Sequence, residues 1–325
     1  MARVTATARV SKTYDVGFDI LGDAARSMHV EVHWPVSEEV RDDVLVCVPG
    51  GSMNLRYFDL GGSEDDRFSF ARQMASRGFV SVLIDPPGVG KSDRPADGHA
   101  LTPDRISQIL ARTLAWVRAE LSDGLISPDL PAMPGLRTIG IGHSMGAMLT
   151  AVQQAQHPQH SGLILLGFGT VGLPDFLSPE ARKLAADPLA VREHLVPMSK
   201  KVFPQSYPTM PGNGGQAGLF GGSSADPDAV RALKAAADVM LPVPAFLSMF
   251  PGNVAPECDR VTVPVRVILG DRDLITAPED IGSMFPQSDD ASLRLLSDTG
   301  HAHFLFASRT DLFDDVADWV RRIAS

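Results

Sequence analysis

Short, almost wholly apolar segments alternate along this chain with segments whose apolar residues recur at helical spacing. The clearest apolar segment covers residues 44–48, and others cover 79–84, 163–166 and 263–269. Strands that are apolar on both faces are typical of a parallel sheet covered by helices on both sides. The repeated alternation therefore predicts an α/β fold with a mostly parallel central sheet and helices on both faces.

Capping signals locate the helices between these strands. Thr102 and Pro103 suit a helix start, because Thr caps the first turn and Pro is tolerated there. An apolar stripe then continues to Leu121, which predicts a long amphipathic helix. The other expected elements are strands at 4–10, 28–34, 138–141 and 292–296 and helices at 68–75, 147–156, 226–240 and 312–323.

One long segment interrupts the alternation. Residues 171–260 are rich in Pro and Gly, and the many small residues within 209–224 indicate a mobile loop. We interpret residues 171–260 as an inserted, mainly helical cap over the face where open α/β sheets bind ligands, with residues 1–170 and 261–325 as the core. The alternative is a set of peripheral helices connected by long loops.

The charge of the chain restricts its partners. A formal net charge of −10 repels phosphate backbones and anionic lipids, so we expect neither nucleic acid nor a membrane as a partner. The sequence has no apolar run of about 18 residues, the length that would predict a membrane span. Residues 1–12 lack the apolar stretch of a signal peptide. Cys47 and Cys258 suggest neither a disulfide framework nor a metal cluster, and Cys47 is expected to be a buried free thiol. We therefore expect a cytoplasmic protein.

The sequence around Ser144 predicts a nucleophile. Residues 142–146 fit the pattern G-x-S-x-G, with an apolar strand before them and a helical segment after them. This arrangement is a nucleophile elbow, a strained strand-to-helix turn that exposes the serine hydroxyl. The start of the helix also favours negative charge that develops nearby. The alternative is a simple Gly-Ser turn.

A serine nucleophile of this kind needs an acid and then a histidine further along the chain. Asp271 and Asp273 both follow the predicted strand at 263–269, at the end where open α/β sheets bind ligands. His301 follows the next strand and is the expected base, with His303 as a nearby competitor. A neutral imidazole would accept the serine proton, while the carboxylate would orient the imidazole.

A glycine-rich turn follows the first buried strand. Residues 49–54 read Pro-Gly-Gly-Ser-Met-Asn, and exposed backbone N–H groups in such a loop would hold an oxyanion together with the N–H of Met145. The alternative is an ordinary glycine turn.

Together these motifs resemble the α/β-hydrolase superfamily, in the branch with a cap after the sixth core strand. The resemblance extends over residues 44–167 and 263–323 and includes residues 85–93, which are similar to the family's D-x-x-G-x-G-x-S loop. One departure is that many relatives have His-Gly where this chain has Pro49 and Gly50.

The resemblance implies a role for five residues and no need of a cofactor or metal. Ser144 would be the nucleophile, Asp273 the acid and His301 the base. The backbone N–H groups of Gly51 and Met145 would form the oxyanion hole.

The expected activity is cleavage of a carboxylic ester or lactone of a small to medium, apolar substrate through an acyl-enzyme. Serine at position 144 argues against haloalkane dehalogenase and epoxide hydrolase chemistry, in which a carboxylate forms an alkyl ester. The cap aromatics Tyr207, Phe246 and Phe250 either bind substrate or form the core of the cap itself. The alternatives are a C–C bond hydrolase or peptidase on the same triad, a non-hydrolytic biosynthetic enzyme, and a binding protein.

Overall fold

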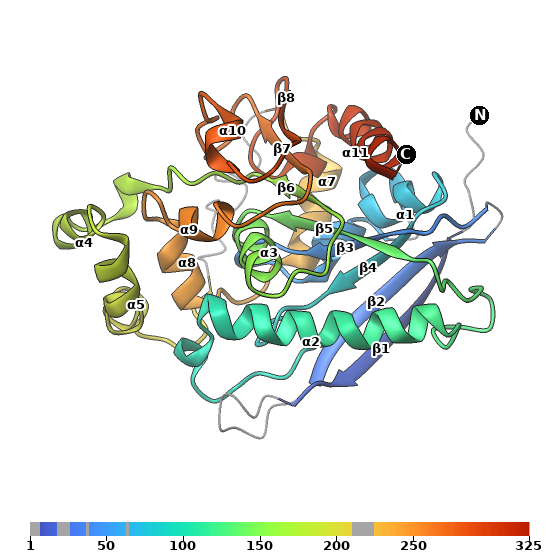
Figure 1. The fold of residues 1–325 in the computed structure, drawn as a ribbon, viewed down its shortest axis with the longest axis horizontal. Helices are drawn as coiled ribbons and strands as arrows, with labels where there is room; N and C mark the ends of the chain where they lie inside the picture. The colour runs from blue at the N-terminus through green and yellow to red at the C-terminus, as the bar shows by residue number, and fades with distance from the viewer. Residues whose placement is uncertain (1–6, 18–26, 37–38, 63–64, 210–223, 325) are drawn as a thin grey trace.

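The computed structural model describes residues 7–17, 27–36, 39–62, 65–209 and 224–324 (Figure 1). These residues form one eight-stranded sheet with helices around it. The strands are β1 (Thr7–Asp15), β2 (Ser27–Pro35), β3 (Asp43–Val48), β4 (Val80–Ile84), β5 (Arg137–His143), β6 (Gly162–Leu166), β7 (Val265–Gly270) and β8 (Ala291–Leu296).

The strand order is β1-β2-β4-β3-β5-β6-β7-β8. Strand β2 is antiparallel to β1 and to β4, and the other neighbouring strands are parallel. The mostly parallel sheet predicted from the apolar runs is therefore confirmed.

The α-helices are α1 (Phe70–Ala75), α2 (Pro103–Ser122), α3 (Met145–Gln156), α4 (Pro179–Leu184), α5 (Pro188–Val202), α7 (Pro227–Leu233), α8 (Pro242–Ser248), α9 (Ala255–Cys258), α10 (Ile281–Met284) and α11 (Arg309–Ala324). The 3₁₀ turns are η2 (Leu55–Asp59), η3 (Asp66–Phe68), η4 (Gly98–Ala100), η5 (Pro174–Phe176), η6 (Lys234–Ala236) and η7 (His303–Leu305).

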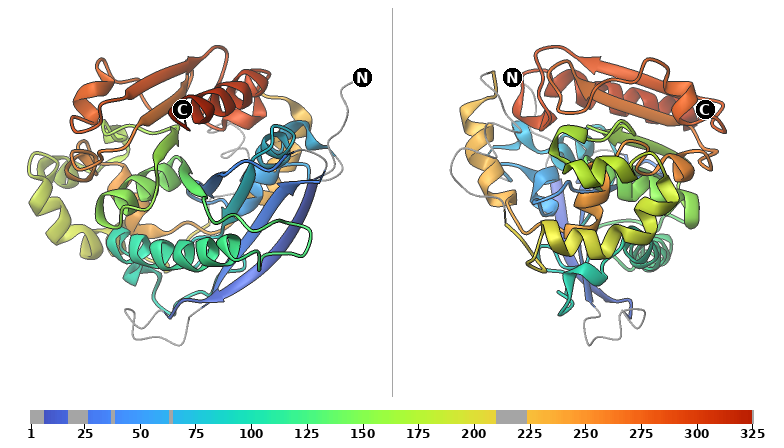
Figure 2. Two further views of the ribbon diagram at one scale, coloured as in Figure 1. Left: turned by 45° about the vertical axis from the view of Figure 1, so that its right-hand side comes forward. Right: turned by 90° about the vertical axis from the view of Figure 1, so that its left-hand side faces the viewer.

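Helices cover both faces of the sheet (Figure 2). α2 and α3 pack on one face, and α1 and α11 pack on the other. Successive residues of β3 alternate between two apolar clusters: Val44 and Val46 join the cluster under α2 and α3, whereas Leu45 joins the cluster under α1 and α11. Because side chains alternate across a strand, a central strand between two helical layers must be apolar at every position.

The helix predicted at 226–240 is shorter than expected. α7 is followed by the turn η6, and Ala237 is already extended. Ala237 pairs with Met53 in an isolated β-bridge, and the N–H of Asp238 donates to the carbonyl oxygen of Ser52 at 2.9 Å. The prediction of a helix to residue 240 was therefore wrong, because pairing with the loop at 49–54 outweighs local helix propensity.

The segment between β6 and β7 divides into two groups of helices. α5 packs against α8, and both α8 and α9 pack against α3. By contrast, α7 and η6 pack beside η7 and η2, in the apolar cluster under α1 and α11. Residues 210–223, most of the loop expected to be mobile, lie outside the described residues.

Cys47 and Cys258 are free and buried, and burial raises the pKa of both thiols. The expectation of a buried free thiol at Cys47 is confirmed. Among the helices that the structure describes, none has the length and apolar composition needed to cross a membrane.

Candidate active site

Ser144 lies between the end of β5 and the start of α3. Its backbone has φ 53° and ψ −120°, and such unfavourable angles cost a non-glycine residue about 1–3 kcal/mol. The N–H of Ser144 donates to the carbonyl oxygen of Leu166 on the neighbouring strand β6 at 2.7 Å. Contacts with the rest of the sheet therefore hold the strained turn in place.

The two glycines of the G-x-S-x-G motif are required by lack of space. A Cβ on Gly142 would lie 2.3 Å from the Cα of Ala147, and a Cβ on Gly146 would lie 2.3 Å from the carbonyl oxygen of Val48. These neighbours are backbone atoms in a close-packed core, so they cannot rotate away as a side chain can. The close approach of α3 to β3 and β5 thus depends on both glycines.

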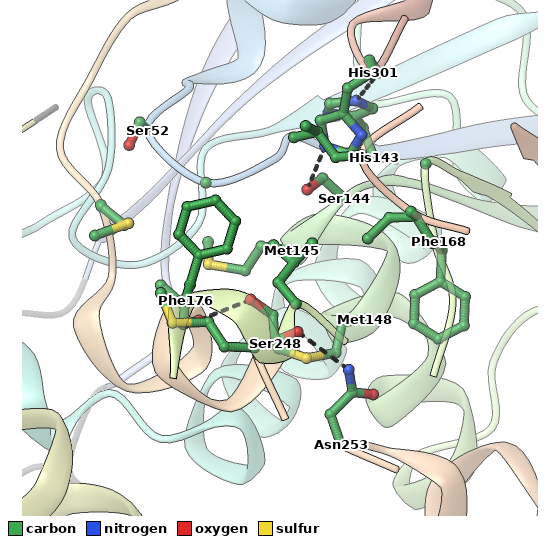
Figure 3. Close-up of a pocket in the computed structure, with 18 of the residues that line it drawn as sticks. Ser52, His143, Ser144, Met145, Met148, Phe168, Phe176, Ser248, Asn253 and His301 are labelled. Atoms are coloured by element: carbon green, nitrogen blue, oxygen red, sulfur yellow. Dashed lines mark hydrogen bonds between the residues drawn. The ribbon is translucent and has the colours of Figure 1, made fainter. Parts of the chain in front are cut away.

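A series of hydrogen bonds leads from Ser144 into the core, and Figure 3 shows its first bond, between Ser144 and His301. The Oγ atom of Ser144 lies 2.9 Å from Nε2 of His301, and Nδ1 of His301 lies 2.6 Å from Oδ1 of Asp273. The side chains of His301 and Asp273 are 2% and 0% exposed, so solvent screens this interaction little. The three residues follow β5, β7 and β8, whose carboxyl ends meet at one edge of the parallel sheet.

The sequence motifs offered two acids and two histidines, and the family resemblance implied Asp273 and His301; the structure gives each of the four a different set of contacts. The carboxylate of Asp271 accepts two backbone N–H groups of residues 298–299, at 2.9 and 3.0 Å, and shapes the turn before His301. Asp273 is the acid beside His301. His303 lies on the other carboxylate oxygen, with its Nε2 3.2 Å from Oδ2 of Asp273.

The charge on Asp273 is fixed by its two imidazole neighbours. Burial raises the pKa of this carboxyl, but His301 and His303 more than compensate and hold the pKa well below its usual range. Asp273 is therefore ionised and accepts the Nδ1–H of His301. With Nδ1 protonated, Nε2 of a neutral His301 presents its lone pair to Ser144, as a general base requires.

His143 is a buried member of this site that the sequence analysis did not single out. Burial, assisted by the nearby His301 and His303, holds the pKa of His143 well below its usual range, so the imidazole is neutral. Its Nε2–H donates to the carbonyl oxygen of His301 at 2.9 Å, and its ring packs on Tyr57 with 4.4 Å between centroids. His143 therefore helps to fix the backbone of His301. Its position inside the G-x-S-x-G motif was the available signal.

Two backbone N–H groups beside Ser144 are free to bind an anion. Within the described part of the chain, neither the N–H of Gly51 nor that of Met145 has a hydrogen-bond partner. The two residues are neighbours, because a Cβ on Gly51 would lie 3.7 Å from the Sδ atom of Met145. Met145 also begins α3, whose N-terminus contributes partial positive charge. Ser52 follows in the same loop with a φ of 61°.

A cavity of about 360 Å³ adjoins Ser144, and no Lys, Arg, Asp or Glu is among the described residues that line it. Figure 3 shows Ser248 and Asn253 at the end away from His301, with Met145 and Met148 between. Most of the lining is therefore apolar, with polar groups at its two ends. The apolar lining residues are Met145, Met148, Phe168, Leu173, Phe176, Phe203, Pro208, Met240, Ala245, Met249, Leu274 and Ile275.

The family model of the alpha/beta hydrolase family matches residues 45–316, which is most of the chain. The protein belongs to this family. The resemblance inferred from the sequence motifs is therefore confirmed. A comparison with curated proteins found no match.

Solved structures share the fold of this α/β hydrolase over nearly its whole length. A monoacylglycerol lipase from Paleococcus ferrophilus is 15% identical, with a TM-score of 0.59, and the match covers 98% of this chain and 99% of that chain. An esterase from Exiguobacterium antarcticum is 16% identical, with a TM-score of 0.60, over 91% of this chain and 96% of that chain. An epoxide hydrolase from Vigna radiata is 13% identical, with a TM-score of 0.59, over 97% of this chain and 98% of that chain. At such identities the likeness establishes the fold alone.

The three aromatic residues expected to bind substrate do not line the cavity of this α/β hydrolase. Phe246 and Phe250 pack edge to face, with 5.0 Å between ring centroids, and both are buried. The hydroxyl of Tyr207 donates to the carbonyl oxygen of Pro95 at 2.7 Å. We therefore correct the prediction for these three side chains. One face of α8 and the residue after it contact the cavity through Ala245 and Met249. Phe246 and Phe250 each follow one of these residues and are turned away from the cavity into the core.

One cluster in this α/β hydrolase has the residue types of a metal site. Glu31, His33 and Asp59 bring possible ligand atoms within 4.8 Å of one another. Arg56, however, pairs with both carboxylates, at 2.7 Å from Glu31 and 3.4 Å from Asp59. Two further arginines also pair with these carboxylates: Arg9 and Arg72. The cluster therefore fits an ion-pair network better than a cation site.

Replacement of Gly146 by Ala is expected to destabilise the protein by about 3 kcal/mol or more, because the new Cβ meets backbone atoms. Gly135→Ala is the matched control: a Cβ there meets only a side-chain oxygen of Asp42, at 3.9 Å, so we expect a change within about 0.5 kcal/mol. Urea unfolding measures both values. Equal stability of the two variants would contradict the close packing described for the elbow.

Proposed function

We propose that this α/β hydrolase is a serine hydrolase that cleaves a carboxylic ester or lactone of a small to medium, apolar substrate through an acyl-enzyme. The observation that carries the proposal is the hydrogen-bonded chain Ser144–His301–Asp273 at the wall of an apolar cavity. Nucleophile and base lie within hydrogen-bond reach, and a third group orients the base, which is the arrangement of an activated serine.

The geometry supports the following reaction. The Oγ atom of Ser144 attacks the substrate carbonyl carbon while its proton passes to Nε2 of His301. The ionised Asp273 stabilises the imidazolium, which then donates the proton to the departing alcohol oxygen. A water molecule then gives a proton to the same Nε2 and attacks the acyl carbon. The imidazolium returns this proton to Oγ of Ser144 as the bond between Oγ and the acyl carbon breaks and the acid leaves.

The negative charge of each tetrahedral intermediate needs donors that are already in place. The N–H groups of Gly51 and Met145, which have no partner in the part of the chain that the structure describes, adjoin Ser144 and would supply two hydrogen bonds to the oxyanion. Pairing of Met53 with Ala237 and of Ser52 with Asp238 restrains the loop that carries Gly51. A restrained loop loses little freedom when the intermediate forms, which favours stabilisation of the charge.

The cavity supports the choice of substrate. A cavity of about 360 Å³ lined mostly by apolar side chains suits a small to medium apolar group. A charged group would find no countercharge among the described lining residues. We further propose that residues 171–260 act as a cap. Leu173, Phe176, Phe203 and Met249 all come from this segment and line the cavity.

Ser144→Ala is expected to abolish labelling of this site by a fluorophosphonate and to lower kcat/KM for esters at least about 10³-fold. Ser248→Ala is the matched control, because Ser248 lines the same cavity but its hydroxyl donates to the carbonyl oxygen of Ala245. We expect labelling of Ser144 in the control. Full esterase activity in Ser144→Ala would exclude the proposed mechanism.

Asp273→Asn is expected to lower kcat about 10⁴-fold, because an amide in place of the carboxylate favours the wrong tautomer of His301. Asp271→Asn is expected to keep kcat within about tenfold, since its side chain only accepts backbone N–H groups. Steady-state kinetics on one activated ester compare the two. A normal kcat in Asp273→Asn would show that Asp273 is not the acid of the proposed mechanism.

Met249→Ala is expected to shift the preference of the enzyme toward longer ester chains, because it enlarges the cavity, with selectivity changes of about tenfold or more. Phe250→Leu is the control: it removes buried volume that does not line the cavity, so stability falls while the chain-length profile stays. A profile unchanged in Met249→Ala would mean that substrate binds elsewhere.

A further inference from the structure

A second hydrogen-bonded set of Ser, His and Asp lies on β1, β2 and the loop after β4. Figure 1 shows these strands on the side of the sheet away from β7 and β8. The Oγ atom of Ser11 lies 2.7 Å from Nε2 of His29, and Nδ1 of His29 lies 2.8 Å from Oδ2 of Asp85. The same imidazole nitrogens face serine and carboxylate as in the chain from Ser144 to Asp273. We propose that Ser11 is a second nucleophile, a surface modification site that takes up an acyl group from small activated carboxylic esters.

The tautomer of His29 follows from the hydrogen bonds of Asp85. Its Oδ1 accepts the N–H of Leu55 at 2.8 Å, and its Oδ2 accepts the N–H of Lys91 at 3.0 Å. A carboxylate that already accepts two backbone N–H groups acts as an acceptor toward the imidazole as well. Nδ1 of His29 therefore carries the proton, and the lone pair of Nε2 faces the hydroxyl of Ser11.

The position of this base is rigid. The backbone N–H of His29 donates to Oγ of Ser92 at 2.9 Å, and the N–H of Asp85 donates to the carbonyl oxygen of His29 at 3.1 Å. The side chains of His29 and Asp85 are only 4% and 2% exposed. The imidazole is thus held in one orientation, and a fixed base near a hydroxyl is the requirement for an activated serine.

Access to Ser11 does not require any movement of the protein. Ser11 is exposed, and β1 is the edge strand of the sheet. The guanidinium of Arg9 projects from the same face of β1, two residues earlier along the strand, and its side chain is 44% exposed. A small electrophile can therefore reach the hydroxyl from solvent, beside the ion pair of Arg9 with Glu31.

The chemistry at Ser11 ends with the acylated serine. Oγ of Ser11 forms a bond to the carbonyl carbon of the ester, its proton passes to Nε2 of His29 and then to the departing phenolate, and the carbon–oxygen bond to the phenol breaks. Ser11 lies within a strand and not at the start of a helix, so no helix N-terminus stabilises an oxyanion there as at Met145. Hydrolysis of the adduct must expel the serine alkoxide, a poorer leaving group than the phenolate lost in its formation, so hydrolysis is slower than acylation and the acyl group accumulates.

The test uses full-length Ser144→Ala protein, so that the cavity site cannot consume the reagent. Treatment with p-nitrophenyl acetate, followed by intact-mass measurement and peptide mapping, is expected to find one acetyl group on Ser11. The double variant Ser11→Ala/Ser144→Ala should lose this adduct. Because Ser11 is exposed on an edge strand, its replacement should not affect folding, which thermal melting verifies.

A further variant separates an activated serine from one that is merely exposed. His29→Asn places an amide nitrogen near the position of Nδ1 and keeps the bond to Asp85, but removes the base; we expect acetylation of Ser11 to slow at least about tenfold. Thr13→Ala is the matched control, in which the rate of Ser11 acetylation should not change. Thr13 is exposed two residues along β1, and its hydroxyl has no hydrogen-bond partner among the described residues. Absence of an acetyl group on Ser11, or an equal rate of Ser11 acetylation in His29→Asn, would overturn the proposal. The hydrogen bonds between Ser11, His29 and Asp85 would then only stabilise the packing of β1, β2 and the loop after β4.

Discussion

The close approach of α3 to β3 and β5 is the constraint on which the candidate active site depends. Gly142 and Gly146 leave only hydrogens where a Cβ would overlap backbone atoms, so helix and strand meet with almost no space between them. The turn that connects them is then too short for ordinary backbone angles, and Ser144 takes a φ of 53°. The same turn leaves the N–H of Met145, at the start of α3, without a partner among the described residues. The close packing of α3 on the two strands thus determines the positions of both the Ser144 hydroxyl and the Met145 N–H.

Charge is the second requirement, because an ionised carboxylate in a core is costly unless it is paired. Asp273 lies between the imidazoles of His301 and His303, and both keep its pKa low. His143 is kept neutral by its burial and donates to the backbone of His301. The strength of this arrangement lies in the exclusion of water, since a buried hydrogen bond to a charge is screened little.

The sequence predicted the features that depend on local pattern. Apolar runs and helix caps identified the sheet and its covering layers, and the spacing in 142–146 located the elbow. Features that depend on distant contacts could not be read in this way. Asp271 and Asp273 differ only in how the chain turns after β7, and the end of α7 is set by pairing with Met53. Likewise, the sequence did not show that the side chain of Met249 lines the cavity whereas that of Phe246 does not.

The most direct test of the account is to trap the acyl-enzyme itself. Rapid mixing of the wild-type protein with an activated ester, acid quench and peptide mapping should find one acyl group on Ser144, formed faster than steady-state turnover. Replacement of His301 by Ala should remove this species, because the hydroxyl then has no base. Steady ester hydrolysis without any acyl group on Ser144 would contradict the account, as would acylation of Ser144 at an unchanged rate without His301.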